Sequence, residues 1–246
     1  MSIKTTLNYS PNFSPKKRSK NKIKFIILHY TGMKSESAAI KKLTNPKSKV
    51  SSHYLIKTTG EIISMVPDLY IAWHAGESFW KKYINLNKNS IGIEITNPGH
   101  EINYKKFTNS QVKSLVKLCK FLIKKYKIKL KNVLGHSDIA PNRKKDPGEK
   151  FPWKNLNKNK ISIWHKLNPG TLTKNRNIKI NVKDKEKFFN NLFAIGYLKK
   201  FQKNPNEKKK YFKSITVAFQ RRFRPEVVNG KPDKECLKIS KNLINQ

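Results

Sequence analysis

Short apolar runs alternate with polar, proline-containing stretches along the first part of the chain, which predicts buried strands joined by loops. The run from Ile23 to Leu28 is rich in isoleucine and predicts a strand that is covered on both faces. Tyr54 to Lys57 and Glu61 to Val66 flank Thr-Thr-Gly, which is typical of a β-hairpin. Ser90 to Thr96 predicts a further strand, in which Gly92 indicates close approach of a neighbouring backbone or ligand.

One long segment that begins at Thr108 has helical periodicity. Thr108 and Gln111 form a capping-box pair at its start. Its apolar face comprises Val112, Leu115, Val116, Cys119, Leu122, Ile123 and Tyr126. Lysines cover the opposite face, so we expect this helix to pack across the sheet. Ser35 to Leu43 predicts a shorter helix with Ser35 as its N-cap, and Lys131 to Leu134 predicts a short strand.

The last part of the chain has helical patterning in three short pieces. Apolar faces occur at 188–193 and 215–223, and Asp233 is placed to cap a third piece. The stretch before them is rich in asparagine and lysine and predicts a linker. The predicted organisation is a polar arm (1–22), a main domain (23–167), a linker (168–183) and a small three-helix domain (184–246).

The chain has 246 residues and a formal net charge of +39. Such a charge is typical of proteins with polyanionic partners, above all nucleic acid. However, lysine far outnumbers arginine and asparagine is abundant, a bias that an A+T-rich genome would impose. Since specific nucleic-acid readers favour arginine, we interpret the charge as a solvated, compositionally biased surface and expect no specific nucleic-acid partner. Cys119 and Cys236 lie far apart and predict buried thiols.

Targeting signals are sparse. No apolar stretch approaches the roughly 18 residues of a transmembrane helix, so we expect no membrane span. The first residues also lack the apolar region of a secretory signal. The cytoplasm is therefore the expected location, or the periplasm if an export signal has been removed. The sequence predicts no oligomeric state.

Candidate chemistry is concentrated in two places. Residues 135–148 combine His136 with two carboxylates and three cations in a loop punctuated by proline and glycine. His29 stands at the end of the first apolar run. Two imidazoles and a carboxylate on strand ends or loops could make a three-ligand zinc site with an open fourth position. An open site of this kind indicates a zinc hydrolase.

Several roles stay open on the residues alone. Asp146 precedes Pro-Gly and could simply start a turn, while His53 and His74 compete as ligands. Glu94 interrupts the apolar run of its strand, where a buried carboxylate is costly unless it is paired or functional. It is either a general base for a metal-activated water or a residue that faces solvent or pairs with a lysine.

Seven motifs, in this order, resemble the zinc-dependent N-acetylmuramoyl-L-alanine amidases of the type 2 amidase family. They are Phe-Ile-Ile-Leu-His-Tyr-Thr (25–31), Ser-His-Tyr-Leu-Ile (52–56), Trp-His-Ala-Gly (73–76), Ser-Ile-Gly-Ile-Glu (90–94), Gly-His-Ser-Asp-Ile-Ala-Pro (135–141), Arg-Lys-Lys-Asp-Pro-Gly (143–148) and Phe-Pro-Trp (151–153). The resemblance covers about residues 23 to 164. It implies an α/β fold with a central mixed β-sheet flanked by helices, as in animal peptidoglycan recognition proteins.

The resemblance also implies roles for particular residues. His29, His136 and Asp146 would hold Zn²⁺, while Glu94 would be the catalytic carboxylate and Lys144 the catalytic cation. The bond cut would be the amide between N-acetylmuramic acid, in intact peptidoglycan or in 1,6-anhydro-muropeptide fragments, and L-alanine of the stem peptide. The expected substrate-side residues are His53, Trp73, His74, Asn97 and Arg143.

Two other functions compete with this one. A non-catalytic peptidoglycan-recognition protein would lack a zinc ligand, whereas all three candidate ligands are present here. A basic nucleic-acid binder would rest on charge alone and would show salt-dependent affinity without any need for zinc.

The C-terminal segment resembles a second family. Ala-Ile-Gly-Tyr (194–197), Ala-Phe-Gln-Arg-Arg-Phe-Arg-Pro (218–225), Asn-Gly (229–230) and Asp233 look like parts of a peptidoglycan-binding three-helix domain. If this segment is a wall-binding module, its removal should weaken attachment to polymeric peptidoglycan. Hydrolysis of a small soluble muropeptide should then be spared.

Overall fold

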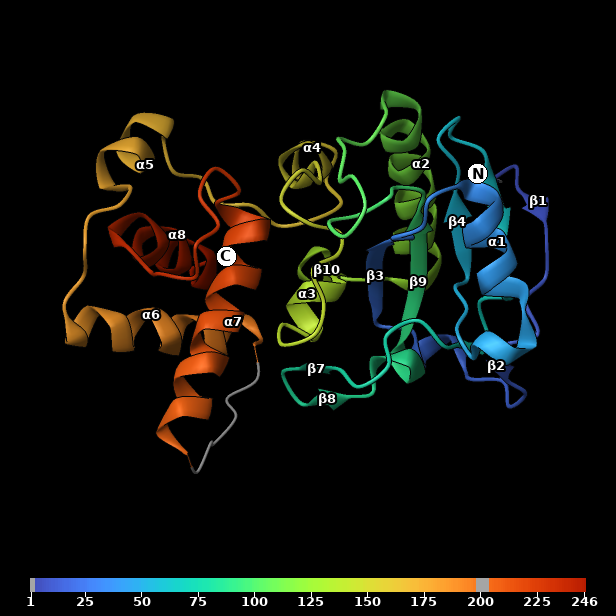
Figure 1. Cartoon of the computed structure of the whole chain (residues 1–246), viewed down its shortest axis with the longest axis horizontal. Coiled ribbons are helices and arrows are strands. Elements are labelled where there is room, and N and C mark those ends of the chain that lie inside the picture. The colour runs from blue at the N-terminus through green and yellow to red at the C-terminus, as the bar shows by residue number, and fades with distance from the viewer. Residues whose placement is uncertain (1–2, 198–203) are drawn as a thin grey trace.

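A six-stranded mixed β-sheet forms the centre of the main domain in the computed structural model, which describes residues 3–197 and 204–246 (Figure 1). The strand order is β1-β5-β4-β9-β3-β10. The strands are β1 (Thr6–Leu7), β3 (Phe25–Tyr30), β4 (Tyr54–Ile56), β5 (Ile62–Ser64), β9 (Ser90–Ile95) and β10 (Val133–Gly135). β3 runs parallel to β9 and β10, and β4 runs parallel to β9 but antiparallel to β5. The predicted mixed sheet and its hairpin are confirmed.

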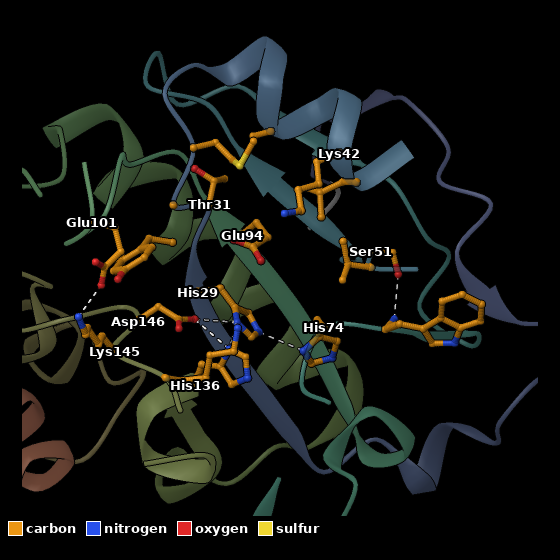
Figure 2. A pocket seen from close by; sticks show the side chains of 18 of the residues that line it. His29, Thr31, Lys42, Ser51, His74, Glu94, Glu101, His136, Lys145 and Asp146 are labelled. Atoms are coloured by element: carbon orange, nitrogen blue, oxygen red, sulfur yellow. Dashed lines mark hydrogen bonds and ion pairs between the residues drawn. The ribbon is translucent and has the colours of Figure 1, made fainter. Parts of the chain in front are cut away.

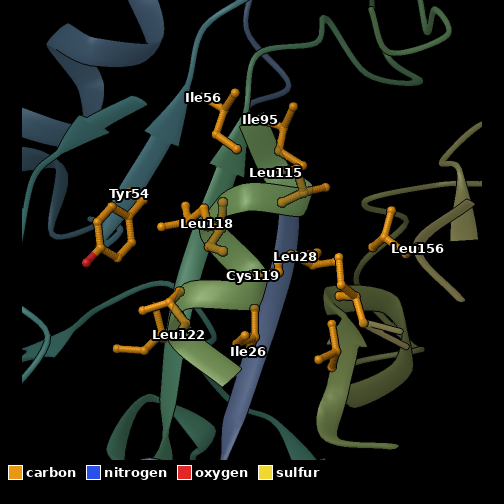
Figure 3. Packing of buried hydrophobic residues seen from close by; sticks show 14 of the residues in the cluster. Ile26, Leu28, Tyr54, Ile56, Ile95, Leu115, Leu118, Cys119, Leu122 and Leu156 are labelled. Atoms are coloured by element: carbon orange, nitrogen blue, oxygen red, sulfur yellow. The ribbon is translucent and has the colours of Figure 1, made fainter. Parts of the chain in front are cut away.

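The long helix α2 (Asn109–Tyr126) covers one face of this sheet. Its buried side chains Leu115, Leu118 and Leu122 belong to the same cluster as Ile26 of β3 (Figure 3). The predicted capping box is present at its start. Burying one such leucine stabilises the fold by about 1.5–3 kcal/mol. Most of the apolar face predicted from the sequence is therefore the contact between helix and sheet. Leu118 joins this contact although the sequence prediction did not include it, and Val112 is only partly buried.

The shorter helix α1 (Glu36–Thr44) covers the opposite face. Ala39 and Leu43 pack in a separate cluster with Leu55 of β4. Successive side chains of a strand point to opposite faces, so Leu55 faces α1 while its neighbours in β4 face α2. The side chain of Ser35 accepts a hydrogen bond from the backbone of the first turn of α1, as the sequence predicts.

The N-terminal arm contributes two strands that the sequence did not predict. β1 adds an edge to the main sheet, and β2 (Phe13–Ser14) pairs with β6 (Ile71–Ala72). The side chain of Arg18 is buried and donates hydrogen bonds to the backbone carbonyl oxygens of Asp68 and Asn87. Strands of two residues show no periodicity, which is why the sequence gave no signal for them.

The remaining elements of the main domain are short. They are the hairpin β7 (Phe79–Trp80) and β8 (Tyr83–Ile84), the helices α3 (His136–Ile139) and α4 (Trp153–Lys158), and 3-10 turns at Lys20–Lys22, Pro46–Ser48, Leu86–Asn89 and Leu130–Asn132. The last of these turns occupies the start of the strand predicted from Lys131, so β10 begins later, at Val133.

After the main domain, the described residues form the helices α5 (Pro169–Asn175), α6 (Val182–Ile195), α7 (Pro205–Phe223) and α8 (Lys234–Ile244). α5 lies within the stretch expected to be a linker. The other three helices correspond to the three patterned pieces of the sequence. Figure 1 shows them as a group beside α3 and the β7–β8 hairpin.

These C-terminal helices share one apolar cluster with the main domain. Phe25 and Ile27 of β3 belong to the same cluster as Phe188 of α6 and Phe219 of α7. Removing the helices would expose this face of the main domain to water. The shared core therefore argues against the expectation that the segment can be removed while hydrolysis of a soluble fragment is spared.

Two further predictions from the sequence concern the cysteines and the absence of a membrane-spanning helix. Cys119 and Cys236 are buried free thiols, as expected. Among the helices of residues 3–197 and 204–246, none combines the length and the apolar character needed to cross a membrane.

Candidate functional site

The ends of three neighbouring parallel strands bring the candidate residues together. His29 near the end of β3 is the register partner of Glu94 in β9, so both side chains lie on the same face of the sheet. His136 follows directly after β10, on the other side of β3. The carboxyl edge of parallel strands is where open α/β sheets commonly bind ligands.

The loop after α3 returns Asp146 to this edge. The backbone N–H of Ser137 donates a hydrogen bond to the carbonyl oxygen of Asp146 at 2.8 Å. Pro147 packs directly on Gly135, where a Cβ atom would lie 2.7 Å from the proline Cδ. Any larger residue at position 135 would push the loop away. The glycine before His136 thus allows the carboxylate and the imidazole to meet.

His29, His136 and Asp146 direct one ligand atom each to a common point (Figure 2). Their Nδ1, Nδ1 and Oδ2 atoms lie 3.0 Å from each other in all three pairs. The ligand atoms of a tetrahedral zinc ion, with bonds of roughly 2.0 to 2.2 Å, lie about 3.3 Å apart. The donor set and its spacing therefore fit zinc with a fourth position left open.

The protonation of this cluster also suits a metal. Burial and, after it, the neighbouring His136 lower the pKa of His29 to about 4, although Asp146 opposes the fall. Burial alone would raise the pKa of Asp146, but the two imidazoles outweigh it and hold that pKa well below its ordinary value. At neutral pH, His29 is therefore neutral and Asp146 ionised, which are the forms that bind a cation.

Glu94 faces the same pocket. Its side chain is half-buried, and its Oε2 atom is buried without a hydrogen-bond partner among the described residues. Burial and then the charge of Asp146 raise its pKa well above the ordinary value, while Lys144 opposes the rise. An unpartnered buried carboxylate is costly for the fold, which favours a chemical role over a structural one.

The pocket has a volume of about 370 Å³, within the usual range for small-ligand sites. The three candidate zinc ligands line it together with Glu94 and Lys144. Its outer walls include Lys42 of α1 and the Trp73 side chain. Lys145 and Glu101 form an ion pair at its rim (Figure 2).

Three of the expected substrate-side residues line this pocket: Trp73, His74 and Arg143. The guanidinium of Arg143 donates hydrogen bonds to the carbonyl oxygens of Ala75 and Glu77, so it also supports the wall. His74 has both ring nitrogens engaged inside the protein.

Two of the expected substrate-side residues lie elsewhere. His53 is fully buried, and its ring nitrogens contact the backbone N–H of Gly92, the carbonyl oxygen of Tyr70 and the guanidinium of Arg18. Asn97 is also buried, and its side chain bonds to backbone groups of its own loop. Neither residue lines the pocket, so the expectation that they contact substrate is not supported.

Residues that the sequence did not single out also shape the site. His136 Nε2 lies 3.0 Å from the carbonyl oxygen of Ala75, and Ser90 lies behind His74. A serine that opens a buried strand was a signal that could have been used. No sequence signal pointed to Lys42, because nothing in a lysine-rich sequence distinguishes it from other surface lysines.

Comparisons with known proteins agree with this geometry. Residues 19–149 match the family described as N-acetylmuramoyl-L-alanine amidase. The N-acetylmuramoyl-L-alanine amidase AmiD of Escherichia coli (strain K12) is 33% identical over 237 residues, which cover 92% of this chain and 83% of AmiD. A structure of E. coli AmiD with the substrate anhydro-N-acetylmuramic acid-L-Ala-D-gamma-Glu-L-Lys matches with a TM-score of 0.80 at 33% identity and covers 91% of this chain and 89% of that chain.

A second solved structure, AMPDH3 from Pseudomonas aeruginosa in complex with anhydromuramic pentapeptide, matches with a TM-score of 0.77 at 32% identity. The match covers 98% of this chain and 94% of that chain, so the likeness includes the C-terminal helices.

Proposed function

The chain belongs to the N-acetylmuramoyl-L-alanine amidase family, and on that premise we propose that it hydrolyses the amide bond between N-acetylmuramic acid and L-alanine of the peptidoglycan stem peptide. The observation that carries this proposal is the convergence of His29, His136 and Asp146 beside the unpartnered carboxylate of Glu94. A non-catalytic recognition protein would need neither the complete ligand set nor a buried base.

We propose that His29, His136 and Asp146 hold Zn²⁺. When bound there, zinc supplies a Lewis acid that lowers the pKa of water towards about 7 and polarises a carbonyl group. With zinc held by His29, His136 and the ionised Asp146, the centre would carry a net positive charge and would attract an electron-rich amide oxygen.

Glu94 acts as the proton carrier in this proposal. Its carboxylate accepts a proton from the attacking water as the oxygen–carbon bond forms at the lactyl carbonyl. When the carbon–nitrogen bond breaks, Glu94 returns that proton to the departing amino group of L-alanine. The raised pKa suits both transfers, because the group must give up its proton as readily as it takes it.

Lys144 stabilises the negative charge that develops on the carbonyl oxygen. Its side chain lines the pocket, and its positive charge acts on both Glu94 and His29. It forms no ion pair within the described parts of the chain that would neutralise it. A cation placed beside a developing oxyanion lowers the barrier by roughly 3–4 kcal/mol where the bound substrate displaces water.

For the substrate, we propose a muropeptide fragment that includes the 1,6-anhydro form. Both solved relatives were captured with anhydromuramic peptides. The pocket volume of about 370 Å³ suits the sugar–lactyl–alanine junction, and Lys42 and Leu43 of α1 line it, so a stem peptide would continue along α1. We further propose that residues 184–246 add contacts to polymeric peptidoglycan, on the basis of their resemblance to wall-binding domains.

Replacing the proposed base tests this mechanism. We expect Glu94→Gln to keep its zinc and to lower kcat for muropeptide cleavage by roughly two to four orders of magnitude, because glutamine cannot accept the proton. Glu101→Gln is the matched control, since Glu101 lines the same pocket but is exposed and paired with Lys145. We expect the control to change kcat by about twofold or less. Wild-type turnover in Glu94→Gln would refute the assigned role.

The same substitution has a predicted effect on stability. The pKa of Glu94 is higher in the folded than in the unfolded protein, so stability falls as pH rises above the unfolded value of about 4.3. We expect metal-free Glu94→Gln to exceed the metal-free wild type in free energy of unfolding by about 1 kcal/mol at pH 8, and to match it at pH 4. Chemical denaturation at the two pH values measures this difference. A variant less stable than wild type at pH 8 would contradict it.

A further inference from the structure

A buried series of hydrogen bonds begins at His29 Nε2, the ring nitrogen that does not face the other two proposed zinc ligands. His29 Nε2 lies 3.0 Å from His74 Nδ1 (Figure 2), and His74 Nε2 lies 3.1 Å from the hydroxyl oxygen of Ser90. The Ser90 hydroxyl in turn donates to the carbonyl oxygen of Leu86 at 2.6 Å. All three side chains are buried, so the series is closed to bulk water at this end.

The carbonyl at the far end sets the direction of every bond in this series. A carbonyl oxygen can only accept, so the single hydroxyl proton of Ser90 is committed to Leu86. The Ser90 oxygen must then accept the proton on His74 Nε2. A neutral imidazole carries one ring proton, so His74 Nδ1 is an acceptor and takes the hydrogen bond from His29 Nε2–H. His29 Nδ1 is left with a bare lone pair.

This unprotonated Nδ1 is the His29 atom that faces the other two proposed zinc ligands. His29 Nδ1 lies 3.0 Å from both His136 Nδ1 and Asp146 Oδ2. The opposite tautomer would put a proton on Nδ1 and block coordination. A histidine ligand whose outer nitrogen is held by a fixed acceptor keeps the tautomer and ring orientation that binding needs.

The second histidine ligand is oriented from the same short segment. His136 Nε2 donates to the carbonyl oxygen of Ala75, the residue after His74. The Asn87 side-chain oxygen accepts hydrogen bonds from the backbone N–H groups of both His74 and Ala75, at 3.1 and 2.7 Å. One dipeptide, fixed at its backbone, therefore holds both imidazoles.

Gly92 makes room for this arrangement. A Cβ atom at position 92 would lie 2.4 Å from His74 Cγ, so the imidazole ring rests directly on the backbone of β9. The sequence predicted a close approach at Gly92 by backbone or ligand; the structure shows a side chain instead.

We propose that His74 and Ser90 are positioning residues that fix His29 in the tautomer whose Nδ1 binds the metal. The proposal rests on the proposed function in taking His29 as a zinc ligand. It replaces the expected substrate contact of His74 with a role that acts through another residue. It also assigns a role to Ser90, which none of the motif roles covered.

Zinc affinity, measured by competition with a chromogenic chelator, tests the proposal without any use of amidase activity. We expect Ser90→Ala to weaken zinc binding by about 10- to 100-fold, because His74 loses the acceptor that selects its tautomer. Ser52→Ala is the matched control. Ser52 lies just before β4 and is as fully buried as Ser90, and its hydroxyl oxygen lies 2.8 and 2.9 Å from the backbone carbonyl oxygens of Tyr54 and Gly92. It forms no hydrogen bond with His74 among the described residues. We expect the control to bind zinc within about twofold of wild type.

Substitutions of His74 separate positioning from packing. His74→Leu fills the space but removes the acceptor, and we expect it to weaken zinc binding by at least about 10-fold. His74→Asn places an amide oxygen near the former Nδ1 position, and we expect it to recover most of the affinity. The absorption spectrum of the Co²⁺-loaded protein should change in His74→Leu and return toward wild type in His74→Asn.

Tautomer assignment in the metal-free wild type needs no variant. Nitrogen NMR of the histidine rings should show His29 protonated at Nε2 and bare at Nδ1. Equal zinc affinity in Ser90→Ala and Ser52→Ala, wild-type affinity in His74→Leu, or a proton on His29 Nδ1 would each overturn the proposal. A wild-type protein that binds no zinc would instead overturn the proposed function, so the two failures are distinguishable.

Discussion

Asp146→Ala is expected to lose its zinc and, with it, amidase activity on the order of 1000-fold or more. Asp146 supplies the only negative charge among the three proposed ligands, and its Oδ2 lies 3.0 Å from the Nδ1 atoms of both His29 and His136. Alanine leaves two neutral nitrogens, which hold a divalent cation weakly. We expect the affinity for zinc to fall at least about 100-fold, measured by metal analysis after dialysis.

Glu149→Gln is the matched control for this substitution. Glu149 lies three positions further along the same loop and is bonded to His100, away from the metal cluster. We expect this variant to keep a stoichiometric zinc complement and near wild-type turnover. A full zinc complement in purified Asp146→Ala would remove Asp146 from the ligand set.

Arg222→Met is expected to lower the free energy of unfolding of the whole chain by about 3–5 kcal/mol. Arg222 of α7 forms a buried ion pair with Asp138 of α3 at 2.6 Å, and it donates to the carbonyl oxygen of Val133 at 2.9 Å. Its guanidinium also lies over the ring of Trp153. Removing the cation leaves the buried Asp138 carboxylate, among the described residues, with hydrogen bonds only from the Tyr197 hydroxyl and the Gly135 N–H.

The effect should reach the metal site, because Asp138 and His136 share the one-turn helix α3. Arg221→Met is the control: Arg221 is the next residue of α7, but its ion pair with Glu149 is looser, at 3.9 Å. We expect that variant to lose about 1 kcal/mol or less. Equal losses of stability in the two variants, measured by chemical denaturation, would show that the Arg222–Asp138 ion pair contributes no more to stability than the Arg221–Glu149 pair.

Removal of residues 184–246 should lower the free energy of unfolding of the main domain even more than Arg222→Met does. The truncated chain would expose Phe25, Ile27 and Leu134, which now lie in one cluster with the C-terminal helices. We expect equal losses of activity on polymeric peptidoglycan and on a soluble muropeptide. A truncated protein that is folded and active on the soluble fragment would restore the view of an independent wall-binding module.

The strands and long helices were predictable because their patterns are local. The isoleucine-rich runs and the amphipathic face of α2 are properties of short windows, and the capping box at Thr108 is a single motif. The pairing of His29 with Glu94 is not local. It depends on the register of β3 against β9, two strands with residues 31–89 between them.

The same distinction explains the histidines. His29, His53, His74 and His136 are all buried, and the local sequence that made His29 and His136 candidates did not exclude His53 and His74 as ligands. What separates them is tertiary: only His29 and His136, among these four, have Nδ1 within 3.0 Å of Asp146. The family resemblance supplied the expected ligand set before the structure was known, whereas the role of His74 needed the contact with Ser90.

One feature of the sequence gives a weak indication that the C-terminal helices pack on the main domain. Arginines are rare in this lysine-rich chain, and Arg222 and Arg224 stand together in the second helical piece. Arginine is better suited than lysine to buried, bidentate or stacked contacts, and both side chains prove to be buried. Their partners on other elements could not be read from the sequence.

The most direct test of the account uses one preparation of the full chain and a 1,6-anhydro-N-acetylmuramoyl tripeptide. Mass spectrometry identifies the products before metal removal, after chelation and after titration with zinc. We predict anhydro-N-acetylmuramic acid and a free peptide that begins with L-alanine, loss of cleavage on chelation, and its return at one equivalent of zinc. An intact substrate in the presence of a full zinc complement, or cleavage that survives removal of the metal, would contradict the account.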